Sequence, residues 1–255
     1  MSQVTIERHA ALLSLRLNRP ERRNAMSGEM YKALTAAIKE ANQDSAIRVI
    51  MLSGEGKGFC AGNDLNDFIA TPDISADSPA LGFLRTLSSS KVPLVAAVHG
   101  AAVGIGTTVL LHSDLVYAAP SSLFAMPFVN LGLVPEAASS LLVPRMMGHV
   151  RAAELLLLGD TFSAQKALDY GLINEIVEED KVHARAFEMA QKLAEKPPQA
   201  LQKSRALLKR ASAAEVQTTI GLEIEEFASQ LAGPEAKEAF AAFFEKRKPD
   251  FSKLG

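Results

Sequence analysis

The sequence predicts an α/β fold followed by a layer made only of helices. Strand-like and helix-like hydrophobic patterns alternate as far as Val177, which is typical of a sheet packed against helices. Two glycine-rich turns, in different parts of the chain, each follow an apolar strand. From Lys181 onward the apolar residues recur with a helical period. These three observations place the sheet in the first part of the chain and the helical layer at its end.

The N-terminal segment predicts a β-hairpin and then a capped helix. Apolar and polar residues alternate in residues 4–7 and 11–17, which indicates two strands that turn near Arg8 and His9. Ser27 is a favourable N-cap residue ahead of a helix with a 3.6-residue period. The inner face of this helix is predicted to consist of Met30, Leu34, Ala37, Ile38 and Ala41.

The first glycine-rich turn follows a short buried strand at residues 48–52. Its glycines make a tight or mobile connection, and Gly62 permits an unusual backbone angle just before Asn63. Residues 70–79 contain two prolines with several Asp and Ser residues, and are predicted to be a loose segment beside a pocket.

The second glycine-rich turn, residues 100–108, follows an apolar run at 92–98 and is predicted to open a buried helix. The first turn of a helix has N–H groups without intrahelical partners, so the N–H of Ile105 can face an oxygen that gains negative charge. Alone, such a turn more often reflects close packing. Two of them indicate backbone donors that converge on one pocket. A dinucleotide site is disfavoured, because the spacing departs from G-x-G-x-x-G and no ribose-binding acid is evident.

The C-terminal part predicts successive helices. Pro198 can open the second of them, and Gly233 and Pro234 separate the last two. The last helix carries Phe240, Phe243 and Phe244 at i, i+3 and i+4, a stripe too apolar to face water. These rings are expected to be buried on the same chain or against another subunit. The first of the helices has a stripe of Val182, Ala186, Met189, Ala190 and Leu193.

Composition narrows the class of protein. The chain has 255 residues, of which 48% are hydrophobic, and its formal charge of −2 predicts no attraction to nucleic acid or anionic membrane. Five His and one Cys do not suggest a zinc site, and Cys60 is expected to be a small core residue. No apolar stretch is long enough for a transmembrane helix, and the start of the chain is a predicted strand, not a signal peptide. Ser252-Lys253-Leu254 is followed by Gly255, so it is not a terminal peroxisomal signal. We expect a cytoplasmic enzyme.

Several motifs resemble those of the crotonase, or enoyl-CoA hydratase/isomerase, superfamily. They are Asn-Arg-Pro-Glu-Arg-Arg-Asn-Ala-Met at 18–26, Phe-Cys-Ala-Gly-Asn-Asp-Leu at 59–65, Pro-Leu-Val-Ala-Ala-Val-His-Gly at 93–100, Asp-Leu-Val-Tyr-Ala at 114–118, and residues 240–251. The resemblance implies a crotonase-type core of repeated ββα units with a C-terminal helical layer. It implies an acyl-CoA-binding core at 1–195, a helical oligomerisation region at 196–255, and a homotrimer or hexamer.

The resemblance also assigns roles within the site. The backbone N–H groups of Asn63 and Ile105 match an oxyanion hole that polarises the thioester carbonyl of an acyl-CoA. Basic clusters at 19–23 and 246–248 either contact the CoA phosphates or are solvated surface charge. The residues implied to bind CoA or substrate are Arg23, Ala25, Ala61, Gly62, Asp64, Leu65, Gly104, Thr108, Phe128 and Lys246.

The acid–base residues favour one reaction over another. The resemblance implies that hydratases carry two carboxylates, at the positions that are Thr108 and Phe128 here. Glu136 is the remaining well-placed carboxylate, and its surroundings are similar to those of Δ3,Δ2-enoyl-CoA isomerases, in which this Glu is the lone base. Burial is expected to raise its pKa. Alternatively, Glu136 follows Pro135 in a first helical turn and complements the helix dipole. Thr107 and Thr108 either line the cavity or cap a helix.

We therefore expect an isomerase of fatty acid metabolism that converts 3-enoyl-CoA to 2-enoyl-CoA by a proton shuttle through Glu136. CoA is part of the substrate, and no other cofactor or metal is expected. The alternatives are an enoyl-CoA hydratase, another crotonase-type acyl-CoA enzyme such as a thioesterase, or a non-catalytic acyl-CoA-binding subunit.

Overall fold

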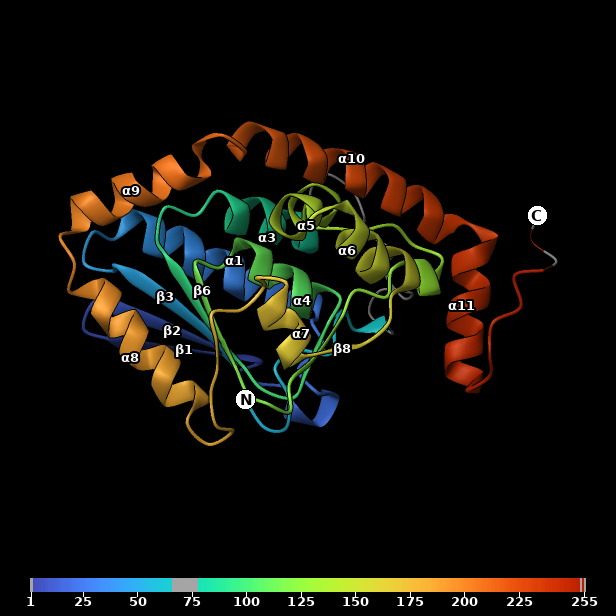
Figure 1. Ribbon diagram of the computed structural model, residues 1–255, viewed down its shortest axis with the longest axis horizontal. Coiled ribbons are helices and arrows are strands. Elements are labelled where there is room, and N and C mark those ends of the chain that lie inside the picture. Colours follow the sequence, from blue (N-terminus) through green and yellow to red (C-terminus); the bar gives the residue numbers. More distant parts are fainter. Residues whose placement is uncertain (1, 66–77, 253, 255) are drawn as a thin grey trace.

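The computed structural model describes residues 2–65, 78–252 and 254, and it contains a twisted main sheet with helices on both faces (Figure 1). Within these residues the main sheet has six strands in the order β1-β2-β3-β4-β6-β9, and all neighbouring pairs except β1 and β2 are parallel. Nearly all of the predicted loose segment at 70–79 lies outside the described residues. The strands are β1 (Val4–His9), β2 (Leu12–Leu17), β3 (Val49–Gly54), β4 (Leu94–Val98), β6 (Leu115–Ala118) and β9 (Glu175–Ile176).

The predicted N-terminal hairpin is confirmed, but its turn lies two residues later than expected. β1 pairs antiparallel with β2 as far as His9 opposite Leu12, so the turn falls at Ala10 and Ala11. β1 is an edge strand whose residues from Glu7 onward are exposed. Hydrophobic alternation therefore does not mark its end.

The main sheet divides the core into two layers, because alternate side chains of a strand point to opposite faces. Val49 and Met51 of β3 pack against α8 (Val182–Ala194). The apolar stripe predicted on α8 is the face of the helix that makes this contact. Ile50 and Leu52 pack on the other face, with α1 (Gly28–Gln43) and α3 (Pro79–Ser88). The oxygen of Ser27 accepts a hydrogen bond from the N–H of Met30 at 3.3 Å, so the predicted cap of α1 is confirmed.

A smaller sheet confirms the repeated strand–strand–helix units. β5 (Ala101–Val103) and β7 (Leu123–Ala125) pair in parallel, and β8 (Phe162–Ser163) pairs antiparallel with β7. β4 of the main sheet leads into β5 of the small sheet and then into α4 (Ile105–Thr108) and a short 3-10 helix, η2 (Val109–His112). The remaining elements before α8 in the described residues are η1 (Pro20–Arg22), η3 (Val129–Leu131), α5 (Ser139–Met147), α6 (His149–Ala153), the π-helix η4 (Glu154–Leu158) and α7 (Ala164–Asp169).

The C-terminal layer consists of α9 (Pro198–Arg210), α10 (Ala213–Ala232) and α11 (Pro234–Glu245). α9 and α10 arch along one side of the core, across the top of the view, and α11 descends at the right (Figure 1). Phe240 is buried, but Phe243 and Phe244 are 59% and 49% exposed, so the expected burial of all three rings does not occur within this chain. The buried face of α11 is instead made by Phe240 and alanines at 236, 239 and 242. None of the helices in the described residues is long and apolar enough to cross a membrane.

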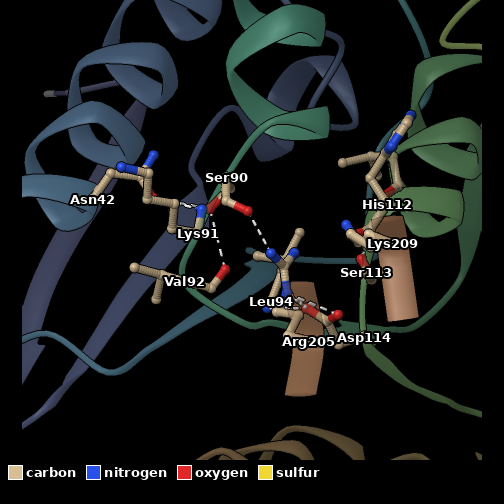
Figure 2. Close-up of polar contacts among 11 residues, drawn as sticks. Asn42, Ser90, Lys91, Val92, Leu94, His112, Ser113, Asp114, Arg205 and Lys209 are labelled. Carbon is tan, nitrogen blue, oxygen red and sulfur yellow. Dashed lines mark hydrogen bonds and ion pairs between the residues drawn. The ribbon is translucent and has the colours of Figure 1, made fainter. Parts of the chain in front are cut away.

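An ion pair attaches α9 to the main sheet (Figure 2). Nε of Arg205 donates to both oxygens of Asp114, at 2.9 and 2.7 Å, and Nη1 donates to the carbonyl of Ser90. Asp114 also accepts from the N–H of Leu94 at 2.8 Å. Leu207 and Leu208 of the same helix are largely exposed. Arg205 is the buried residue of α9 and fixes it at the start of β4 and β6.

Candidate active site

The two glycine-rich turns lie side by side, as predicted. The N–H of Cys60 donates to the carbonyl of Ala101 at 2.9 Å, and the N–H of Val103 donates to the carbonyl of Cys60 at 2.9 Å. Gly62 has a φ of 100°, and a Cβ there would lie 3.2 Å from the oxygen of Val103. A side chain at Gly62 would therefore be strained and would press the two turns apart.

Two backbone donors, those of Asn63 and Ile105, lie on these adjoining turns. Within the described part of the chain, neither N–H donates a hydrogen bond to another protein atom. The side-chain oxygen of Asn63 accepts from the hydroxyl of Tyr31, which attaches the first turn to α1. Unpaired donors held by rigid neighbours are suited to stabilise an oxygen that becomes negative during a reaction.

A pocket of about 520 Å³ opens beside these turns. Arg22 and Arg23 lie at its wall together with Phe243 and Phe244 of α11, so the exposed rings of that helix border the pocket. The predicted site residues that line it are Arg23, Ala25, Ala61, Gly62, Asn63, Asp64, Leu65, Gly104 and Phe128. Thr108, which was predicted to bind substrate, is not among its lining residues, and neither are Ile105 and Glu136.

Lys246 does not line this pocket, although it was predicted to bind CoA. It ends α11 in a left-handed conformation, with a φ of 54°, and is exposed. Its neighbour Arg247 forms ion pairs with Glu238 and Glu245. In the N-terminal basic cluster, Arg19 pairs with Asp64 at 3.0 Å, so this arginine supports the loop.

Glu136 lies in the segment that precedes α5, before the helix begins. The interpretation that it complements the dipole from a first helical turn is therefore wrong. Ala137 and Ala138 follow it with φ values of 61° and 57°, a left-handed turn that is unfavourable for residues with a Cβ. This turn separates Glu136 from the helix and aims its side chain toward α4, where Thr108 donates to Oε1 at 3.3 Å.

The surroundings of Glu136 favour its neutral form. The residue is 7% exposed, and burial, together with the charge of Glu223, raises its pKa to about 7. The hydrogen bond from Thr108 acts in the opposite direction. The expectation that burial raises this pKa is confirmed, and it makes Glu136 able both to take and to return a proton near neutral pH.

The two threonines of α4 have different roles. The hydroxyl of Thr108 contacts Glu136, whereas that of Thr107 donates to the carbonyl of Ala102 at 2.5 Å and accepts from the N–H of Ala125 at 3.3 Å. Thr107 therefore fastens α4 to the small sheet. Cys60 is a buried core residue as predicted, and burial raises the pKa of its thiol to about 12.

Sequence reasoning missed several residues that shape the site. Asn24 donates to the carbonyls of Glu55 and Gly58, each at 2.8 Å, and so ties the first glycine-rich turn to the N-terminal motif. Tyr31 donates to the side chain of Asn63, and Glu223 accepts from the N–H of Ala138 in the segment that follows Glu136. A polar group on an otherwise apolar helix face is the only signal the sequence offers for these two. Among the described residues, no group of three or more His, Cys, Asp or Glu side chains is placed to hold a metal ion.

Comparison with known proteins supports a specific family. A sequence model of the enoyl-CoA hydratase/isomerase family matches residues 7–253. The chain is 37% identical to a 1,2-epoxyphenylacetyl-CoA isomerase of Escherichia coli K12, over 94% of this chain and 95% of that protein. It is 32% identical to a 2,3-dehydroadipyl-CoA hydratase of the same organism, over 98% and 99%. A crystal structure of an enoyl-CoA hydratase/isomerase from Pseudoalteromonas atlantica T6c superposes with a TM-score of 0.94, at 41% identity and with 98% and 99% of the two chains covered.

Proposed function

The chain belongs to the enoyl-CoA hydratase/isomerase family, and from this premise we propose that it moves the double bond of 3-enoyl-CoA to 2-enoyl-CoA. The observation that supports this most strongly is Glu136, a buried carboxylate whose pKa is raised to about 7. A double-bond shift needs one group that removes a proton from C2 and returns one to C4. A carboxylate with a pKa near the working pH performs both tasks.

In the proposed mechanism the thioester oxygen accepts hydrogen bonds from the N–H groups of Asn63 and Ile105. Glu136 removes the proton from C2, and the resulting dienolate places its charge on that oxygen. Loss of one such donor typically costs about 2.7–4 kcal/mol of transition-state stabilisation, so two donors account for a large part of the barrier reduction. Glu136 then delivers the proton to C4, which completes the shift without net gain or loss of protons.

The residues at positions 108 and 128 argue against hydration. Adding water to an enoyl thioester typically uses two carboxylates that hold the water jointly, and Thr108 and Phe128 are not acids. Thr108 is itself engaged with Glu136, and Phe128 is buried at the pocket wall. In this proposal the reaction requires neither a metal nor a redox cofactor, since only a proton moves, and CoA enters as part of the substrate.

The CoA portion is proposed to lie along the pocket wall formed by the first glycine-rich turn and the N-terminal motif. Arg22 and Arg23 supply cationic groups for phosphates at this wall. Asp64 supports the wall through its ion pair with Arg19 rather than by contact with an anionic ligand.

A second candidate follows from the 37% identity to a 1,2-epoxyphenylacetyl-CoA isomerase over nearly the whole chain. Isomerisation of a ring epoxide on a CoA thioester would also benefit from hydrogen bonds that stabilise negative charge on the thioester oxygen. The same two backbone donors serve both reactions, so the substrate assay must include both thioesters.

The test compares the wild type with Glu136→Gln, which keeps the side-chain shape and removes the base. Isomerisation of 3-enoyl-CoA is expected to fall by at least ~10²-fold, in line with general-base contributions, while binding of a non-reacting CoA thioester is retained. Hydration of crotonyl-CoA, measured as the incorporation of labelled oxygen from the solvent, is expected to be very slow.

Three results would contradict the proposal. Near-full isomerase activity in Glu136→Gln excludes this residue as the base. Rapid hydration without isomerisation makes the protein a hydratase. CoA-thioester binding without turnover of either thioester, unaffected by the substitution, indicates a non-catalytic binding subunit.

A further inference from the structure

Glu223, on α10 of the C-terminal layer, binds the segment that follows Glu136. Its Oε2 accepts a hydrogen bond from the N–H of Ala138 at 2.5 Å. Its Oε1 accepts from the N–H and the hydroxyl of Ser140, at 2.9 and 2.6 Å. Glu223 is 8% exposed, so one buried carboxylate satisfies three donors at the start of α5.

The segment held in this way is strained. Ala137 and Ala138 both have positive φ, a conformation that persists in residues with a Cβ only when the surroundings enforce it. Glu223 holds one side of this turn through the N–H of Ala138. Nε2 of the buried His112 lies 2.8 Å from the carbonyl of Ala137 and holds the other side. Because a carbonyl only accepts, Nε2 carries the hydrogen in this contact.

The C-terminal layer also supports His112. Nζ of Lys209, on α9, donates to the carbonyl of His112 at 3.2 Å, and the two residues lie beside each other in Figure 2. Burial lowers the pKa of His112 to about 4, with smaller contributions from Lys209 and Arg205, so the ring is neutral at neutral pH. The turn after Glu136 is therefore held by Glu223 directly and by α9 through His112.

Glu223 also affects the charge environment of Glu136. It lies on α10, and its negative charge is the second contribution to the raised pKa of Glu136, after burial. Among the described residues, Tyr31 from α1 and Cys60 from the first turn also interact electrostatically with Glu136, and burial raises the pKa of both, so both are neutral. Burial raises the pKa of Glu223 itself, while the hydrogen bonds that its two oxygens accept from Ser140 and Ala138 act in the opposite direction and favour its ionised form.

We propose that Glu223 is a positioning residue of the active site: it holds the strained turn that aims Glu136 and keeps a negative charge beside that carboxylate. The C-terminal layer thereby completes the active site from outside the core. This inference rests on the proposed function only in taking Glu136 as the base. It assigns Glu223 no contact with substrate.

The first experiment compares Glu223→Gln with the wild type. The amide presents N–H groups where a carboxylate oxygen accepted, so the N–H of Ala138 or of Ser140 loses its partner. Because small displacements of a catalytic group are costly, kcat is expected to fall roughly 10- to 100-fold with little change in KM. Removing the negative charge lowers the pKa of Glu136, so the rising limb of kcat/KM against pH should move to lower pH. Glu226→Gln, an exposed change of the same kind on the same helix, is the matched control and should leave both unchanged.

A second measurement separates this inference from the proposed function. The protonated Glu136 carboxyl gives an infrared band that is identified as the difference between wild type and Glu136→Gln. Its titration midpoint should move to lower pH in Glu223→Gln, whether or not Glu136 is the catalytic base. Full activity in Glu136→Gln would therefore defeat the proposed function alone. A midpoint and kcat in Glu223→Gln equal to those of the Glu226→Gln control would overturn the role of Glu223.

If Glu223→Gln does not fold, Ala138→Gly is added to it. Glycine adopts positive φ without a Cβ penalty, so the turn then needs less support. The double variant is expected to fold and to keep the lowered midpoint of Glu136, because the charge of Glu223 is still missing. A folded double variant with the wild-type midpoint would contradict the inference.

Discussion

At the scale of single residues, the behaviour of Glu136 is set by opposing neighbours. Burial and the charge of Glu223 raise its pKa, while the hydroxyl of Thr108 lowers it. A fully paired carboxylate would be a poor base for a carbon acid, because its charged form would be too stable. The arrangement around Glu136 therefore favours proton transfer at the expense of stability.

This cost is a testable prediction. The pKa of Glu136 is raised from 4.5 to about 7 in the folded protein. Below the lower value both states are protonated and there is no penalty; as pH rises through this window, the unfolded state releases its proton first and the folded state loses stability. The loss approaches about 3 kcal/mol above the folded pKa, at 1.36 kcal/mol for each pKa unit.

Glu136→Gln removes this titration, so its gain in Tm over the wild type should be larger near pH 8 than near pH 5. Calorimetry of both proteins at equal concentration measures the difference. A Tm difference that is independent of pH would show that Glu136 is not buried with a raised pKa.

At the scale of elements, the close approach of α4 to the first glycine-rich turn determines how the two backbone donors lie relative to each other. Cys60 lies against Gly106 of α4, where a Cβ would stand 2.5 Å from the Cys60 oxygen. The absence of a side chain at Gly106 therefore lets Asn63 and Ile105 belong to one site. Local pattern predicts a buried helix here, but only the contact explains why this position is glycine.

Gly106→Ala is expected to push α4 away from the turn. Overpacking of this kind typically costs about 1–3 kcal/mol of stability, and the displaced donors should also lower kcat. Denaturant unfolding and isomerase assays measure the two effects. Gly82→Ala in α3 is the control, since a Cβ there would have no atom of the described residues within 4 Å. This substitution should leave stability unchanged or raise it by up to about 1 kcal/mol. Equal behaviour of the two variants would refute the packing argument.

At the scale of the whole molecule, the C-terminal layer does more than cover the core. α9 is fixed to the sheet by Arg205, and α10 reaches the active site through Glu223. The division into a core at 1–195 and an oligomerisation region at 196–255 remains a proposal. In that proposal the second region also supports the catalytic segment.

Large apolar side chains that remain exposed on the single chain favour assembly. Phe243 and Phe244 are about half exposed, and Val150 is 81% exposed. Burying one such side chain is worth roughly 1.5–3 kcal/mol, which favours an interface. Light scattering at micromolar concentration is expected to give a mass that is a multiple of three subunits. A stable, fully active monomer would contradict this expectation and leave the assignment of Glu136 intact.

The sequence alone determined the elements whose signals are local. Alternation in β2, the Ser27 cap of α1 and the stripe of α8 are decided by near neighbours along the chain, and each is confirmed. The paired glycine-rich turns also follow from the sequence, because glycine next to an apolar strand limits how the chain can continue. The predicted end of β1 was wrong by two residues, because an exposed strand has no hydrophobic alternation to mark where it ends.

Only the tertiary structure decided how Glu136 is held. Glu223 is 85 residues from Ala138 in the sequence, and no spacing rule links a carboxylate on one helix to the N–H groups of a distant turn. The same holds for Tyr31 and Asn63, and for His112 and the turn it supports. Hydrogen bonds form wherever packing brings a buried donor to an acceptor, and packing depends on the whole chain. The raised pKa of Glu136 was therefore predictable from its residue type and burial, whereas the contacts that support its segment became visible only in the folded molecule.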